Sequence, residues 1–226
     1  MKNRILLLFF LLAVFSSCNA QQKPETYPEC VSRIKSVRDS LNREYLRLDA
    51  AGKDSIIKVA RQFVFRSVTK DIFTYWYGTR WEFYGQTRVP RQGTIACGYF
   101  VTAVLSDAGF NIPRVAWAQQ ASEFFILKMS TDIRHFSNSP VSDVISYIRS
   151  RENGLYMVGL DCHVGFVYKN NDTIQFVHAN YYQPSTGVMS ENLDTWNPLN
   201  ASKYRVFGRI LDDACMRKWL GNERIE

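Results

Sequence analysis

The sequence has no internal repeat, no low-complexity segment and no apolar run long enough for a comfortable membrane span. The absence of repeats excludes a solenoid or a repeat array. Lys and Arg are scattered rather than clustered, so we expect no nucleic-acid partner. The net charge of +7 would suit an anionic polymer or a membrane surface, although a solvated basic surface also accounts for it.

The N-terminal residues are typical of an export signal, because Lys2 and Arg4 precede a short apolar run that small residues follow. The segment that ends at Cys18 resembles a lipobox. It predicts a signal peptide over 1–18, cleavage before Cys18 and attachment of a lipid to that cysteine. Cleavage after Ala20 is the alternative. In both cases we expect an exported protein, either in the periplasm or anchored as a lipoprotein at the cell envelope.

Export permits disulfide bonds among the other four cysteines. Cys30 and Cys215 lie near opposite ends of the chain, on predicted helices, and a disulfide between them would join the termini. Two reduced and buried cysteines are the equal alternative.

The apolar pattern changes along the chain from helical to strand-like. A polar linker over 19–27 precedes one α+β domain over 28–226, in which N-terminal helices pack on an antiparallel sheet. The pattern predicts a helical extension over 28–72, broken at Ala51-Gly52. It then predicts helices over 97–109, 115–129 and 140–149, strands over 155–160, 163–169, 173–180 and 204–211, and a last helix over 212–220.

Cys97 has the setting of a catalytic thiol. It follows a Gly-flanked loop and starts the helical pattern over 97–109. Unpaired N–H groups at a helix start favour an anion, so we expect a lowered thiol pKa. The thiolate is the nucleophilic form, which makes Cys97 the candidate nucleophile.

The chain has only three histidines, so few groups can serve as its base. His135 is predicted between helices and has no evident partner. His163 opens one strand and His178 ends the next; a hairpin that pairs them is centred between residues 170 and 171, in the predicted turn. Facing positions lie within side-chain reach, so we expect His163 as the base and His178 as the group that orients it.

An aromatic, Gly-punctuated stretch precedes the Cys97 helix. We expect an ordered loop over 75–92 that lines the cleft, with Trp81 near the substrate and the Tyr84 hydroxyl as an oxyanion donor. A loop that only covers the core is the alternative.

Three motifs resemble those of the NlpC-type papain-like cysteine peptidases, which are bacterial cell-wall endopeptidases. They are a cysteine at a helix start, a strand that begins His163-Val164-Gly165, and a next strand that ends Val177-His178-Ala179. The resemblance covers roughly Trp76 to Tyr181. It implies a papain-like fold, a Cys-His-His triad without a cofactor, and hydrolysis of a peptide bond in peptidoglycan stem peptides.

The chain departs from the family around the nucleophile. The family usually has Asp-Cys-Ser-Gly-Phe where this chain has Ala96-Cys97-Gly98-Tyr99-Phe100. The family's Tyr-Gly-Gly before the cysteine is similar to Tyr84-Gly85-Gln86 here, with Gln86 in place of glycine. The residues that read the family's substrate therefore do not carry over.

Two other classes remain open. A non-catalytic exported module would bind peptide or glycan in a groove formed by 75–84. A zinc site of Cys97, Cys162, His163 and His178 is disfavoured, because the adjacent Cys162 and His163 point to opposite faces of a strand. We expect a monomeric hydrolase whose partners are a peptidoglycan peptide or another amide substrate and, through the lipid anchor, the membrane.

Overall fold

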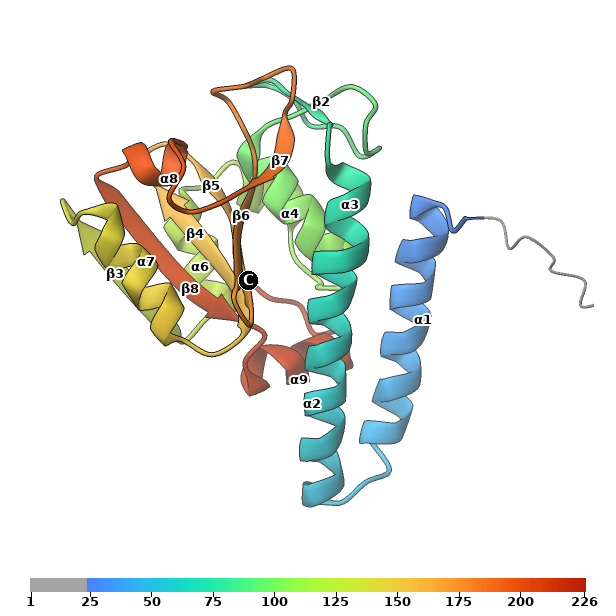
Figure 1. The fold of residues 1–226 in the computed structure, drawn as a ribbon. Helices are drawn as coiled ribbons and strands as arrows, with labels where there is room; N and C mark the ends of the chain where they lie inside the picture. Colours follow the sequence, from blue (N-terminus) through green and yellow to red (C-terminus); the bar gives the residue numbers. More distant parts are fainter. Residues whose placement is uncertain (1–23) are drawn as a thin grey trace, which may run out of the picture.

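An antiparallel six-stranded sheet is the centre of the computed structural model, which describes residues 24–226 (Figure 1). The predicted signal peptide and Cys18 lie outside the described residues. The strand order is β3-β8-β4-β5-β6-β7. The strands are β3 (Asp132–Ser137), β4 (Gly154–Leu160), β5 (Val164–Asn170), β6 (Thr173–Ala179), β7 (Val188–Glu191) and β8 (Tyr204–Ile210). The α+β class is confirmed.

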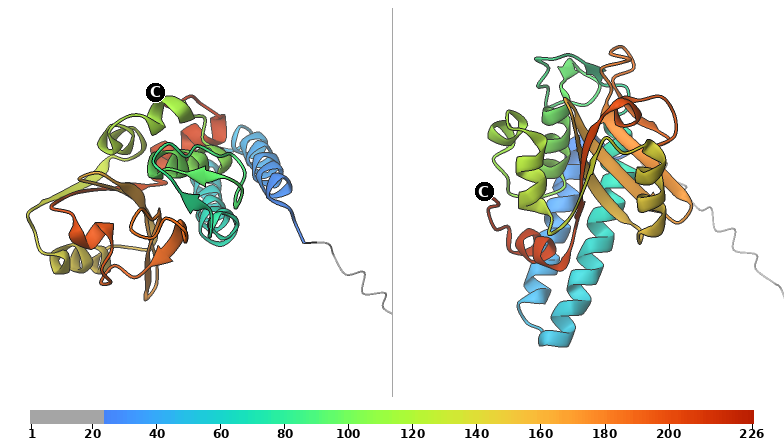
Figure 2. Two further views of the ribbon diagram at one scale, coloured as in Figure 1. Left: turned by 90° about the horizontal axis from the view of Figure 1, so that it is seen from above. Right: turned by 90° about the vertical axis from the view of Figure 1, so that its left-hand side faces the viewer.

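Helices cover both faces of this sheet (Figure 2). Alternate residues of each strand point to opposite faces, so Met157 and Phe166 belong to one apolar cluster and Tyr156 and Val167 to the other. The first cluster includes residues of α1 (Tyr27–Tyr45), α2 (Ala50–Arg66), α3 (Phe73–Trp76), α4 (Cys97–Asp107), α5 (Arg114–Ala118), α6 (Ser122–Met129) and α9 (Asp213–Gly221). The second includes residues of α7 (Val141–Ser150) and α8 (Pro198–Ala201).

The N-terminal helices form a hairpin that reaches past the sheet (Figure 1). A π-helical segment, η1 (Ser67–Ile72), joins α2 directly to α3. The predicted break between two helices is present, but it lies over 46–49 rather than at Ala51-Gly52, because the Asp49 side chain accepts a hydrogen bond from the Gly52 N–H and so caps the start of α2. In the described part of the chain no helix is both long and apolar enough to cross a bilayer.

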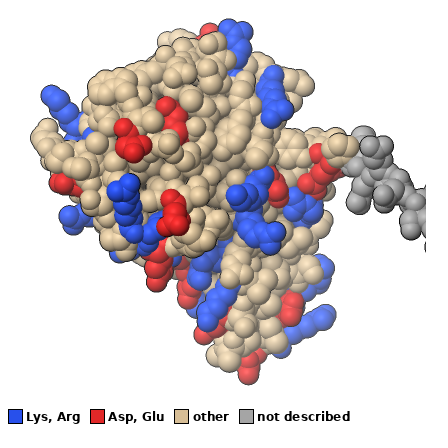
Figure 3. Space-filling view, viewed as in Figure 1, with Lys and Arg blue, Asp and Glu red and all other residues tan. Residues whose placement is uncertain are grey.

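Other boundaries also differ from those predicted. The single helix expected over 115–129 is two helices, α5 and α6, and the strands β3 and β7 were not predicted. The aromatic stretch begins as helix α3 and continues through a short parallel pair, β1 (Arg80–Trp81) and β2 (Thr94–Ile95). On the face shown in Figure 3, Lys and Arg lie among Asp and Glu.

Cys30 and Cys215 are free and buried, so the predicted disulfide is not formed. Burial raises the pKa of the Cys30 thiol to about 11 and that of Cys215 to about 12. Both thiols therefore stay protonated at neutral pH and act as small apolar side chains of the core.

The β5–β6 hairpin turns through Asn171, which has φ of +55°, and Asp172. Its register pairs Phe166 with Val177, and one step further places Gly165 opposite His178. The predicted pairing of His163 with His178 is therefore wrong by two residues. Because side chains repeat every two residues, this shift leaves both histidines on the same face of the sheet.

Residue 165 must be glycine, because β6 packs too closely against it to leave room for a side chain. A Cβ atom at this position would lie 2.6 Å from Phe176 Cε2 and 2.9 Å from His178 Cβ. We expect Gly165→Ala to lower the free energy of unfolding by about 1–3 kcal/mol, as overpacking does in other cores. Urea unfolding of both proteins measures the difference.

Gly221→Ala is the matched control, because the added Cβ would contact only the flexible Glu223 side chain, at 3.2 Å. It should leave the free energy of unfolding within about 0.5 kcal/mol. Equal stability of the two variants would show that β6 does not need the space above Gly165.

Candidate active site

Cys97 is the first residue of α4, as predicted. Ala96 precedes it in an extended conformation and offers no side-chain cap, so the N–H groups of the first turn are free to face a ligand or the thiol. The Ala96 N–H donates to the Gly85 carbonyl, and a Cβ on Gly85 would lie 2.6 Å from the Ile95 backbone N. The Tyr84-Gly85 segment therefore holds the backbone just before Cys97.

Residue 98, next to the candidate nucleophile, is glycine because α5 crosses at that point. A Cβ on Gly98 would lie 2.6 Å from the carbonyl oxygen of Ala118, a backbone atom that cannot move aside cheaply. The glycine at this position, where the resembled family has serine, is thus explained by the packing of α5 against the start of α4.

His163 lies in the tight turn between β4 and β5, one residue before the strand that it was expected to open. The Leu160 N–H donates to the His163 carbonyl. The Asp161 carboxylate accepts hydrogen bonds from the backbone N–H groups of Lys203 and Tyr204 at 2.8 and 2.9 Å, which ties the turn to β8. These bonds hold the ring of His163 in place, and it is only 4% exposed.

Three buried side chains form a hydrogen-bonded row behind the turn. His163 Nε2 lies 2.8 Å from His178 Nδ1, and His178 Nε2 lies 2.7 Å from Glu191 Oε1 on β7. The His178 ring also stacks on Phe176 at 4.1 Å between ring centres. The predicted contact of the two histidines is present, whereas Glu191 was missed because β7 was not predicted.

Cys97 and His163 line the same pocket, of about 340 Å³, at the start of α4. Its other walls come from α5, α6 and the β4–β5 turn, with Glu123, Cys162 and Tyr204 among the polar lining. His163 Nδ1 is buried and makes no hydrogen bond, so the sulfur of Cys97 does not donate to it in this structure. Burying a polar atom without a hydrogen-bond partner lowers the stability of a protein, and active sites are one setting where such atoms are retained.

The surroundings of Cys97 and His163 favour the neutral form of each side chain. Burial raises the pKa of the Cys97 thiol, and the N–H groups of Val164, Gly98 and Cys97 itself oppose this effect. Burial and the neighbouring His178 hold the pKa of His163 well below its usual value. The expectation of a lowered thiol pKa is therefore wrong, because burial outweighs the helix start.

The aromatic residues are placed differently from the prediction. Tyr84 is 81% exposed, packs edge-on against Phe83 and is not among the residues that line the pocket. Trp81 packs against Tyr181, whose ring in turn packs against His163 at 5.1 Å between ring centres. Tyr181 is thus the aromatic neighbour of the base.

The remaining predicted candidates lie apart from the row of buried side chains. His135 is exposed on β3 and bonds Glu123 at 2.7 Å. Cys162 is exposed, with its sulfur 3.7 Å from the Tyr181 hydroxyl. Within residues 24–226, no three His, Cys, Asp or Glu side chains are grouped so that they could hold a metal ion.

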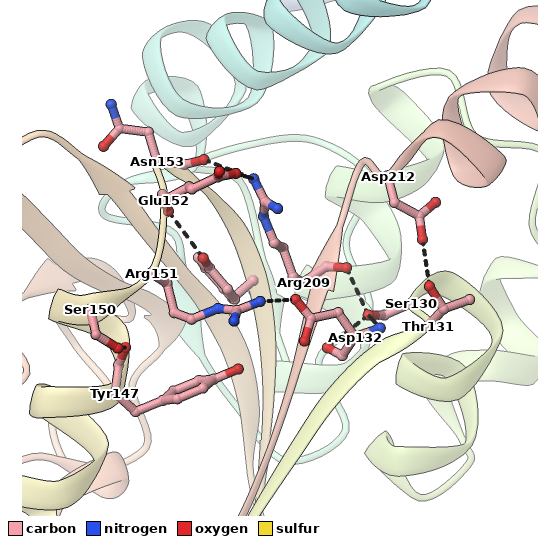
Figure 4. Close-up of polar contacts among 11 residues, drawn as sticks. Ser130, Thr131, Asp132, Tyr147, Ser150, Arg151, Glu152, Asn153, Arg209 and Asp212 are labelled. Atoms are coloured by element: carbon pink, nitrogen blue, oxygen red, sulfur yellow. Dashed lines mark hydrogen bonds and ion pairs between the residues drawn. The ribbon is translucent and has the colours of Figure 1, made fainter.

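A larger pocket, of about 670 Å³, lies at the other end of the sheet. Two ion pairs line it, Arg61 with Asp213 and Arg209 with Glu152, and its Asp212 carboxylate accepts from the Thr131 hydroxyl and the Cys215 N–H. Figure 4 shows the second pair beside the ion pair of Arg151 and Asp132. The smaller pocket brings a thiol and a histidine together, so we take it rather than the larger one as the candidate site.

Comparison with protein families, curated proteins and solved structures finds no match to this chain.

Alkylation of Cys97 by iodoacetamide should follow the raised thiol pKa, because only the thiolate reacts and a neutral His163 provides no cation to hold it. We expect the rate in the folded protein to rise only above the ordinary thiol range, about pH 8.5. Mass spectrometry of the Cys97 peptide at successive pH values measures it.

The same peptide in urea-unfolded protein is the reference. The rate in the folded protein should inflect at a higher pH than in the unfolded chain. An inflection at lower pH would mean that a thiolate–imidazolium pair is already present at rest.

Proposed function

We propose that this protein is an exported cysteine hydrolase of the NlpC-type papain-like class, which cleaves an amide bond in peptidoglycan stem peptides. The observation that carries the proposal is the unpartnered, buried Nδ1 atom of His163 in the pocket that Cys97 also lines. A neutral imidazole with a free lone pair beside a thiol at a helix start has the composition of a nucleophile and its base.

The reaction follows from these groups. As the sulfur of Cys97 attacks the carbonyl carbon, its proton passes to His163 Nδ1, and the carbonyl π electrons move to the oxygen. The tetrahedral intermediate then collapses, the C–N bond breaks, and His163 returns the proton to the leaving amine. Water, activated by the same ring, hydrolyses the thioester and restores the thiol.

The developing oxyanion needs donors that are already in place. The N–H groups of Cys97 and Gly98 serve this role at the uncapped start of α4. Because thiol and base are neutral at rest, the charges form only as the substrate is attacked. The pocket around them is partly closed by α5 and α6, which strengthens each charge interaction.

The stem peptide as substrate rests on the motifs around His163 and His178, and the charge of the protein agrees with it. The chain stays net positive without Lys2 and Arg4 of the predicted signal peptide, which favours an anionic cell-wall polymer over a cationic one. Two carboxylates, Glu123 and Asp161, line the pocket itself. Both already accept hydrogen bonds from the protein, so the pocket wall is polar and ordered.

Cys97→Ala and His163→Ala should each lower kcat/KM for a purified muropeptide by at least about 10³-fold, because one removes the nucleophile and the other its base. Mass spectrometry of the cleaved stem peptide measures the rate. Glu152→Gln is the control, since Glu152 is exposed and lies at the other end of the sheet; its rate should equal that of wild type.

The alternative, a binding module without catalysis, makes a different prediction for the same experiment. Wild type and Cys97→Ala would then retain the muropeptide equally and release no product. Cleavage that survives in Cys97→Ala would eliminate the proposed mechanism.

A further inference from the structure

A buried hydrogen-bond path continues behind the two histidines and ends on a backbone group. The Tyr182 N–H donates to Asn180 Oδ1 at 2.8 Å, and Asn180 Nδ2 then donates to Glu191 Oε1 at 3.1 Å. A backbone N–H can only donate, so it settles which end of the Asn180 amide faces Glu191. Asn180 is itself 1% exposed, and water does not compete for these bonds.

The same carboxylate oxygen meets His178. Glu191 Oε1 accepts from Asn180 and also lies 2.7 Å from His178 Nε2. Burial raises the pKa of Glu191, and the carboxylate in its ionised form can only accept hydrogen bonds, so the hydrogen between the two groups is carried by His178 Nε2. The Glu191 side chain is only 10% exposed, which favours a single arrangement of this pair.

The direction of each remaining bond follows. Burial lowers the pKa of His178 to about 3, so the ring is neutral and carries one proton, on Nε2. His178 Nδ1 must then accept, and His163 Nε2 donates to it at 2.8 Å. His163 is also neutral, so its other nitrogen, Nδ1, has a free lone pair. That atom belongs to the ring that lines the pocket with Cys97.

We propose that Glu191, oriented by Asn180, is a positioning residue that selects the ring tautomers of His178 and His163 and thereby leaves His163 Nδ1 as the proton acceptor. The catalytic consequence rests on the proposed hydrolase function; the tautomers themselves do not. During the reaction one proton moves from the sulfur of Cys97 to His163 Nδ1, while His163 keeps its hydrogen on Nε2. The bonds behind the ring therefore keep their direction.

Two substitutions separate the role of the acceptor oxygen from that of packing. Glu191→Gln keeps an oxygen for both donors, because the Asn180 amide orients the new side chain. Glu191→Met fills a similar volume but offers no strong acceptor. Nitrogen-15 spectra of the labelled histidines read the tautomers without substrate, with the exposed His135 as internal reference.

Wild type and Glu191→Gln should show His163 and His178 protonated on Nε2, whereas Glu191→Met should show both tautomers of each ring. A wild-type spectrum with the His163 proton on Nδ1 overturns the proposal. So does a Glu191→Met spectrum identical to that of wild type.

Activity gives a second readout. On a muropeptide, Glu191→Met should lower kcat by about 10²-fold or more with little change in KM, while Glu191→Gln loses about tenfold or less. Glu152→Gln is the control, since Glu152 is an exposed carboxylate at the other end of the sheet and should match wild type. Equal kcat for wild type and Glu191→Met overturns the proposal. If the wild type hydrolyses no muropeptide, only the hydrolase function is overturned. The tautomers are then still tested by the nitrogen-15 spectra.

Discussion

The close approach of β6 to Gly165 is the constraint on which the site depends. With no side chain at that position, Phe176 and His178 occupy the space above β5, and the His178 ring reaches diagonally to His163. The resulting bond lies in a region that excludes water, where a hydrogen bond is stronger and an unpaired group more costly than at the surface. The order of the whole row, from Asn180 to His163, follows from this contact.

The hairpin shows how far local pattern predicts such a site. The two strands, the turn between them and the shared face of His163 and His178 were all predicted from alternation and from the Asn-rich turn. The pairing was wrong by two residues, because the turn holds only Asn171 and Asp172 between the paired strands. Because side chains alternate between the two faces of a sheet, a shift of two residues keeps both histidines on the same face, so their contact was still predicted. Cys97 at the start of a helix was predicted for a similar reason, since helix starts have local signals.

The features of the site that could not be predicted from the sequence depend on segments far apart in the chain or on how deeply a side chain is buried. β7 is short, and nothing in its own residues indicates that it pairs with β6. Glu191 was therefore not identified as a site residue. The protonation of Cys97 was also predicted in the wrong direction, because a helix start is visible in a sequence whereas the depth of a side chain is not. Tyr84 was placed near the thiol by its neighbours in the chain, yet the turn at Gly85 directs it to solvent.

The placement of the proposed nucleophile and base on separate parts of the chain has a consequence for folding. α4 carries the thiol, while the β4–β5 turn carries the base, and α5, α6, β3, α7 and β4 fold between them. Such a site has high contact order, because neither the helix nor the hairpin alone contains both Cys97 and His163. The chain between them must fold back before the two side chains can meet. A partly folded chain that has formed only the helix or only the hairpin therefore lacks the proposed site, whatever the order in which these elements form.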